Sequence, residues 1–206
     1  MTDKKNIALS ETRFGVKILS SRHPDIRKLK KQHPTSIHGN KPWKSSFLLM
    51  DYFRRNPLPA GSRVMEIGCG WGPAGIYLNR YHDCQVTAID ADPDVFPFLQ
   101  LHADINKASI TSCTRRFEDI RKRDLADIDV LIAADVCFWD ELTDTHRKLI
   151  KRAINAGVSK IVYADPMRSP FLSLADICAE TYHAECTELE LKRFKARGAL
   201  MVIENA

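Results

Sequence analysis

Long apolar runs are missing from this sequence of 206 residues. No stretch approaches the length that a bilayer-spanning helix needs, and the first residues lack the apolar core of a signal peptide. The six cysteines include no C-x-x-C pair, a spacing typical of metal sites and redox motifs. We therefore expect a reduced, cytoplasmic protein that binds neither a membrane nor a metal ion.

The dinucleotide-binding pattern G-x-G-x-x-G is also absent. An apolar strand ending at Ile67 leads into glycines at 68, 70 and 72, and position 73, where the third glycine would be needed, is proline. Glycines at this turn let a backbone approach a ligand closely. The carboxylate of Glu66 would repel a pyrophosphate but suits a cationic amino-acid group. The turn therefore favours S-adenosylmethionine over NAD.

Acidic residues follow the next two expected strands. Asp90 ends the strand 85–89, where a carboxylate can accept hydrogen bonds from both ribose hydroxyls. Beyond the strand 110–114, Phe117 and Asp119 could hold the face and the amino group of an adenine. The alternatives are that Asp90 only caps a turn and that Asp119 is a surface acid.

The expected strands alternate with helices, which predicts a parallel sheet. Further strands are expected at 63–67, 129–134, 160–164, 185–194 and 198–204, and helices at 45–53, 73–81, 94–106, 141–156 and 170–182. The last two strands follow each other directly and indicate a terminal hairpin. We expect a Rossmann-like α/β fold with helices on both faces of the sheet.

The residues after the fourth strand of this sheet are candidates for chemistry, because open α/β sheets bind ligands at the carboxyl ends of their strands. Asp135 can orient an amine nucleophile or accept hydrogen bonds from it. Phe138 and Trp139 can form walls that attract an alkylammonium group. Alternatively, Asp135 caps the next helix and the two aromatic residues belong to the core.

The run 64–78, Asp90 and the strand ending in Asp135 together resemble the class I, seven-β-strand S-adenosylmethionine-dependent methyltransferases over residues 37–206. The resemblance implies a mostly parallel seven-stranded sheet whose last strand is antiparallel. It also implies S-adenosylmethionine as cofactor. The cofactor-binding residues it implies are Trp43, Glu66, Gly68, Cys69, Gly70, Gly72, Asp90, Phe117, Asp119 and Asp135.

Three motifs resemble the protein-lysine methyltransferase branch, and in particular the electron-transfer-flavoprotein lysine methyltransferase. The run Trp43-Lys44-Ser45-Ser46 is similar to a W-x-S-S motif, residues 135–138 to D-x-x-Y, and residues 165–168 to D-P-x-R. Phe138 departs from this pattern because it lacks the tyrosine hydroxyl. Trp43 is implied as a wall near the cofactor, with helix packing as its alternative role.

The positive charge is concentrated in the first 44 residues, which hold eleven Lys or Arg and three acids, a net charge of +8. The remaining residues carry 20 basic and 23 acidic side chains, a net charge of −3. We therefore divide the chain into a basic extension, 1–44, and a methyltransferase domain, 45–206. The extension could steer an acidic partner toward the site, or it could be a solvated helix face.

These observations predict an N-methyltransferase that acts on a protein lysine, with Asp135, Phe138 and Trp139 as catalytic residues. A small-molecule N- or O-methyltransferase acting on a nicotinamide-like amine is the alternative. An RNA methyltransferase fits less well, because no (Asp/Asn)-Pro-Pro-(Tyr/Phe) motif follows the fourth strand. A cofactor-binding protein without catalysis is a further alternative.

Overall fold

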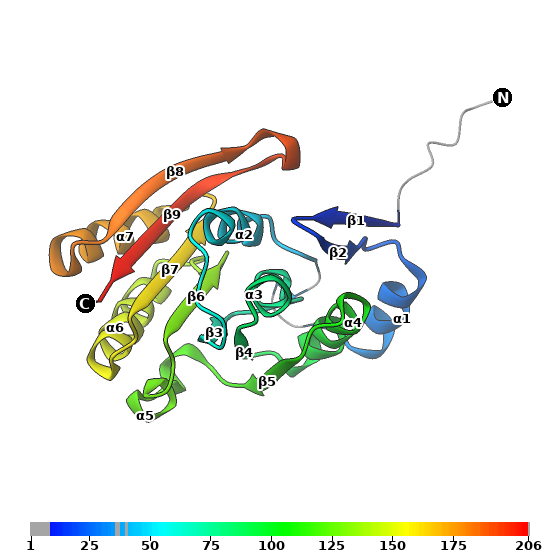
Figure 1. Cartoon of the computed structure of the whole chain (residues 1–206), viewed down its shortest axis with the longest axis horizontal. Helices are drawn as coiled ribbons and strands as arrows, with labels where there is room; N and C mark the ends of the chain where they lie inside the picture. Colours follow the sequence, from blue (N-terminus) through cyan, green and yellow to red (C-terminus); the bar gives the residue numbers. More distant parts are fainter. Residues whose placement is uncertain (1–8, 36–37, 40, 206) are drawn as a thin grey trace.

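The computed structural model describes residues 9–35, 38–39 and 41–205. A seven-stranded sheet with the order β5-β4-β3-β6-β7-β9-β8 forms its centre (Figure 1). The strands are β3 (Arg63–Ile67), β4 (Gln85–Asp90), β5 (Ile110–Thr114), β6 (Val130–Ala134), β7 (Lys160–Asp165), β8 (Glu185–Leu191) and β9 (Ala196–Glu204). Strands β3 to β7 run parallel, and β9 runs antiparallel to β7 and β8. The predicted fold class is confirmed.

Helices cover both faces of this sheet. One core packs α2 (Ser45–Arg55), α3 (Pro73–His82) and α4 (Phe96–Asn106) against the sheet, and the other packs α5 (Lys122–Leu125), α6 (Glu141–Ala156) and α7 (Ser169–Tyr182). Successive strand residues alternate between the two cores, as Val64 and Met65 do. The central strands, such as β6 and β7, are apolar on both sides for this reason.

Several element boundaries differ from the expected ones by two or three residues, and two of these differences have a clear cause. The segment expected as one helix, 94–106, begins with the 3₁₀ turn η1 (Pro93–Val95), in which the Phe96 N–H donates to the Pro93 carbonyl. Pro97 has no N–H to give that carbonyl an α-helical bond, so α4 starts only at Phe96. At the end of the chain, β8 is shorter than expected because the 3₁₀ turn η3 (Lys192–Phe194) and a left-handed Lys195 lead directly into β9.

The N-terminal segment contains elements that the sequence patterns did not predict. Strands β1 (Ser10–Arg13) and β2 (Val16–Leu19) form a hairpin, and α1 (Pro24–Gln32) follows it. Phe14 and Gly15 both have positive φ, which suits a two-residue hairpin turn. Ile18 and Ile26 are buried, and these elements contact α3 and α4 (Figure 1). Much of the predicted basic extension therefore packs on the α3–α4 side of the sheet.

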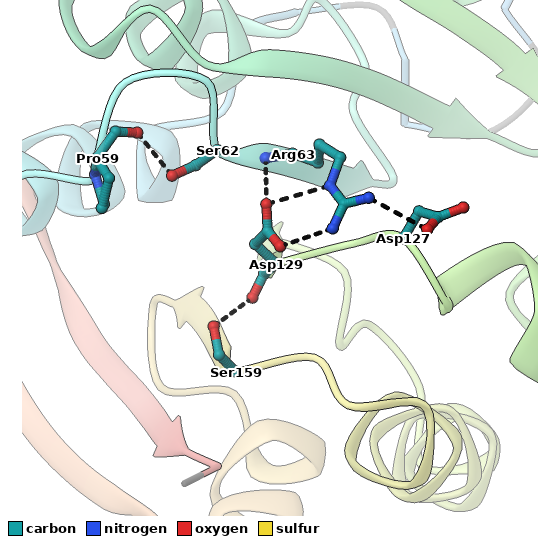
Figure 2. A network of polar contacts seen from close by, with 6 residues as sticks. All are labelled: Pro59, Ser62, Arg63, Asp127, Asp129 and Ser159. Atoms are coloured by element: carbon teal, nitrogen blue, oxygen red, sulfur yellow. Dashed lines mark hydrogen bonds and ion pairs between the residues drawn. The ribbon is translucent and has the colours of Figure 1, made fainter.

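A polar network fixes the starts of three parallel strands, at the sheet edge opposite their carboxyl ends (Figure 2). The Arg63 guanidinium donates to both carboxylate oxygens of Asp129 and to Asp127, and the Arg63 backbone N–H donates to Asp129 Oδ2 at 2.7 Å. The Ser159 hydroxyl donates to the Asp129 carbonyl at 2.8 Å. Hydrogen bonds from Arg63 lower the pKa of Asp129. The network holds β3, β6 and β7 in register.

In the part of the chain that the structure describes, none of the helices is both long and apolar enough to cross a membrane. All six cysteines are free thiols, and four of them are buried.

Candidate functional site

A cavity of about 380 Å³ opens at the carboxyl ends of the parallel strands. The loops after β3, β4, β5 and β6 form it, together with His38, Gly39 and Trp43 before α2. The predicted site residues that line it are Trp43, Gly68, Gly70, Asp90, Phe117, Asp135, Phe138 and Trp139. The cavity therefore brings together the residues predicted for cofactor binding and those predicted for catalysis.

The glycine turn between β3 and α3 contributes Gly68 and Gly70 to the cavity wall. Gly68, Gly70 and Gly72 all have positive φ, at 60°, 52° and 65°. A Cβ atom at Gly70 would project into open space, so this backbone leaves room for a ligand. A Cβ atom at Gly72 would lie 2.2 Å from Leu99 Cδ1, so Gly72 is required for packing against α4 and does not line the cavity.

Asp90 is tied to the glycine turn. Its Oδ2 accepts a hydrogen bond from the Gly70 N–H, and its Oδ1 accepts one from the Asp92 N–H, both at 3.0 Å. Burial raises the pKa of Asp90. Each carboxylate oxygen has a second lone pair, so the group can still accept bonds from a pair of hydroxyls. An open glycine cradle beside such an acceptor fits the nucleoside part of S-adenosylmethionine.

Glu66 does not line the cavity, contrary to its expected contact with a cationic cofactor group. The side chain is buried, and its Oε2 accepts a hydrogen bond from the Gly75 N–H in the first turns of α3 at 3.0 Å. Burial raises the pKa of Glu66 to about 8. This carboxyl group therefore holds the turn and the start of α3 together, and it is mostly protonated at neutral pH.

Two further predicted residues lie outside the cavity wall. Cys69 is buried, and its backbone N–H donates to the Ile89 carbonyl, which links the turn to β4. Asp119 is exposed in the 3₁₀ turn η2 (Phe117–Asp119), while its neighbour Glu118 lines the cavity. The tight 3₁₀ turn presents Glu118 to the cavity instead of Asp119, a difference that strand spacing alone does not predict.

Phe117 forms an apolar wall near the glycine turn. A Cβ atom at Gly68 would approach its ring to 3.5 Å. On its other side the ring contacts His146, with centroids 4.7 Å apart. Burial lowers the pKa of His146 to about 4, so this imidazole is neutral. His146 Nδ1 lies 3.3 Å from the Tyr163 hydroxyl, and the pair supports the Phe117 wall from behind.

Asp135 lines the cavity directly after β6, in a left-handed backbone conformation with φ 58°. Its Oδ2 accepts a hydrogen bond from the Ser45 N–H at 3.0 Å, at the start of α2. Its Oδ1 accepts one from Arg168 Nη2 at 3.1 Å. Arg168 also donates to Asp165 through Nη1 at 2.6 Å and through its backbone N–H at 2.8 Å.

Asp135, Asp165 and Arg168 form a cluster in which two carboxylates share one guanidinium. The cluster carries a net negative charge when both aspartates are ionised. Burial raises the pKa of Asp165 to about 6. The sequence motif 165–168 pointed to Arg168, but its bond to Asp135 was missed because the two residues are far apart in the chain. The cluster joins the ends of β6 and β7 to the start of α2.

Aromatic rings line the cavity beside Asp135. The Phe138 ring stacks on His38 with centroids 4.1 Å apart, and Trp43 and Phe138 form an edge-to-face pair with centroids 5.3 Å apart. The Arg168 guanidinium also lies over the Phe138 ring, with its central carbon 4.3 Å from the ring centroid. Trp139 is 47% exposed and lies at the rim. His38 was not predicted, because no local pattern marks it.

A sequence model of the lysine methyltransferase family matches residues 23–171. The electron transfer flavoprotein beta subunit lysine methyltransferase of Xenopus laevis is 26% identical over 132 residues, 64% of this chain and 53% of that protein. The chain spans about half the length of the curated relatives it matches.

Solved structures share the fold at low identity. TrmN from Thermus thermophilus superposes with a TM-score of 0.63 and 14% identity, over 78% of this chain and 49% of that one. The Pyrococcus abyssi tRNA (uracil-54, C5)-methyltransferase, solved with S-adenosyl-L-homocysteine, gives a TM-score of 0.62 and 18% identity, over 94% and 43% of the two chains. By its sequence match and its fold, this chain belongs to the lysine methyltransferase family of class I, S-adenosylmethionine-dependent methyltransferases.

Proposed function

We propose that this protein methylates the side-chain nitrogen of a lysine in another protein. The observation that carries the proposal is that Asp135 lines the same cavity as the aromatic residues Trp43, Phe138 and Trp139. Asp135 follows β6, the strand next to β3, so it also lies close to the glycine turn. A carboxylate next to aromatic faces suits an alkylammonium group, because both attract a cation.

Different residues of the cavity would bind the cofactor and orient the substrate. Gly68, Gly70, Asp90 and Phe117 would hold the nucleoside of S-adenosylmethionine, which supplies a methyl group bonded to a positively charged sulfur. Asp135 would accept a hydrogen bond from the substrate amine and so orient its lone pair toward that methyl group. The amine must lose a proton to expose this lone pair, and water at the open rim can take it.

The remaining predicted residues would act through the shape of the site. Glu66, Cys69 and Gly72 hold the turn, and Arg168 fixes the Asp135 carboxylate. Phe138 cannot supply the hydroxyl that the D-x-x-Y motif provides. We propose that its ring, held between His38 and Arg168, serves only as a wall of the lysine channel.

A cell extract incubated with the protein and methyl-tritiated S-adenosylmethionine tests the substrate class. We expect label in the protein fraction, released by acid hydrolysis as methyllysine. Label confined to small molecules would instead support a small-amine methyltransferase, and ribonuclease-sensitive label would support an RNA substrate.

The role of Asp135 is tested by Asp135→Asn, with Asp140→Asn as control. Asp140 is exposed, lies five residues further along the same loop, and makes no side-chain capping bond. We expect Asp135→Asn to lower kcat by about 10²-fold or more, the usual contribution of such a group, while calorimetry shows S-adenosylhomocysteine binding retained. Equal activity of the two variants would remove Asp135 from the catalytic site.

We also propose a cytoplasmic location. All six cysteines are free thiols, and a reducing compartment preserves them.

A further inference from the structure

Helix α1 presents a basic face, defined here as Arg27, Lys28 and Lys31. The opposite side of the helix is anchored by Ile26, which is fully buried with Leu19, Trp71 and Phe98. Arg27, Lys28 and Lys31 are exposed, and Lys31 neighbours each of the other two on the helix surface because it follows Arg27 by four residues and Lys28 by three. The orientation of the basic face is therefore fixed by packing.

The basic face is not neutralised by ion pairs with the described residues. Its three side chains form no ion pair with any acid in residues 9–35, 38–39 or 41–205. Like charges at this spacing repel one another and destabilise an isolated helix. Asp25, three residues before Lys28, and the position of Lys31 in the last helical turn, where the helix dipole favours a cation, offset part of this repulsion.

The basic face ends near the cavity. His33, the residue that caps α1, lies with its Nδ1 3.1 Å from Asp94 Oδ1 in η1. Asp92, two residues before Asp94, lines the cavity. A partner that contacts α1 can therefore also reach the cavity mouth.

The cavity has the opposite charge. Among the described residues, four carboxylates line it against one guanidinium, Arg116. The carboxylates are those of Asp90, Asp92, Glu118 and Asp135. A nucleic acid would have to bring its phosphates to this acidic mouth together with the target base. A protein can present acidic residues to α1 and a separate lysine to the cavity.

We propose that the basic face of α1 docks an acidic patch on the substrate protein, close to the lysine that enters the cavity. The inference rests on the proposed lysine specificity for the identity of the group that enters, and on α1 alone for the docking. It assigns the positive charge of the N-terminal segment to substrate selection.

The test uses two synthetic peptides, each with one lysine, which differ in a flanking run of glutamates or of serines. Anisotropy of the labelled peptides measures binding to the full-length protein, and transfer of tritiated methyl groups measures activity. We expect the glutamate peptide to bind about ten-fold more tightly than the serine peptide, and the difference to shrink with added salt.

The basic face is altered by Lys28→Glu with Lys31→Glu, which lowers the net charge by four. The control, Lys107→Glu with Lys151→Glu, makes the same change at two exposed positions that do not line the cavity, the residue that caps the end of α4 and a residue on α6. We expect the first pair to remove the preference for the glutamate peptide and the control pair to keep it. Lys28→Gln with Lys31→Gln, checked by thermal melting, gives an intermediate loss without new repulsion.

Equal binding of the glutamate peptide to the basic-face and control variants would overturn the proposal. The proposal would also be overturned if total tRNA bound the basic face more tightly than the glutamate peptide and acquired the methyl label. If the glutamate peptide binds through the basic face but neither peptide is methylated, the docking surface stands and the lysine specificity is wrong.

Discussion

Glu66 illustrates how burial changes the task of an acidic residue. From the sequence it was a charge for the cofactor, whereas in the fold it is a buried carboxyl group bonded to the Gly75 N–H. Its pKa is raised from 4.5 to about 8, chiefly by burial. In the unfolded chain the same group ionises at its ordinary value. The folded protein therefore binds one extra proton between these two pH values.

This extra proton predicts the pH dependence of Glu66→Gln. A raised pKa contributes stability that is full below pH 4.5 and is lost progressively until about pH 8. Glutamine can accept the Gly75 bond without ionising. We expect the free energy of unfolding of Glu66→Gln, relative to the wild type, to rise by about 1 kcal/mol per pH unit across this window.

Urea denaturation at several pH values measures this difference. Because other acids titrate equally in both proteins, their contribution cancels in the comparison. A constant difference between pH 5 and pH 8 would mean that Glu66 is ionised in the folded state, and its assignment as a cofactor-facing charge would return.

Single residues were predictable where a local pattern places them. Gly68, Gly70, Asp90 and Asp135 lie at or shortly after the carboxyl ends of strands, and these strand ends meet at one side of the sheet. His38 and the Arg168–Asp135 bond depend on which loops the fold brings together, and no spacing in the sequence encodes that.

Among the elements, the turn between β3 and α3 has a second role besides forming the cavity. Trp71, between two of its glycines, points away from the cavity and stacks on Phe98 with parallel rings at 5.3 Å. Its indole N–H donates to the Gly39 carbonyl at 2.9 Å, and it packs with Leu19 and Ile26. The N-terminal elements β2 and α1 thus pack against the glycine turn through Trp71, on the side away from the cavity.

We expect Trp71→Ala to destabilise the protein by about 3–5 kcal/mol, because it opens a large cavity among four elements. Since the turn loses its support, S-adenosylhomocysteine binding should also weaken. Trp139→Ala, which changes an exposed tryptophan at the rim, should leave the free energy of unfolding nearly unchanged. Urea denaturation and calorimetry on both variants provide the comparison. Similar unfolding energies would contradict the supporting role of Trp71.

At this scale the sequence predicted the parallel strands and helices well, because each carries its own apolar pattern. It missed the β1–β2 hairpin, whose strands have four residues each. Such short strands give little periodicity, and their burial arises only through contact with α3 and α4. The turn at Phe14 and Gly15 was the one local signal that could have indicated them.

For the whole molecule, the fold class follows from the alternation of strands and helices, but the distribution of charge does not follow from sequence position alone. The segment 1–44 is basic as a whole, yet packing decides that Lys28 and Lys31 face outward while Ile26 anchors the helix. The cavity gathers acidic residues from loops far apart in the chain. The protein therefore has a basic surface on α1 and an acidic cavity at the carboxyl ends of its parallel strands.

Strand β8, at the edge of the sheet, has a consequence for self-association. An open edge exposes unpaired backbone groups, and a second copy could pair with them. Here Glu185, Glu188 and Glu190 are exposed along that edge, so two copies would bring like charges together. We expect Glu188→Ala with Glu190→Ala to make the protein aggregate at lower concentration, as light scattering would detect, with unchanged melting temperature. The acidic edge would then act as a colloidal stabiliser that keeps the enzyme dispersed.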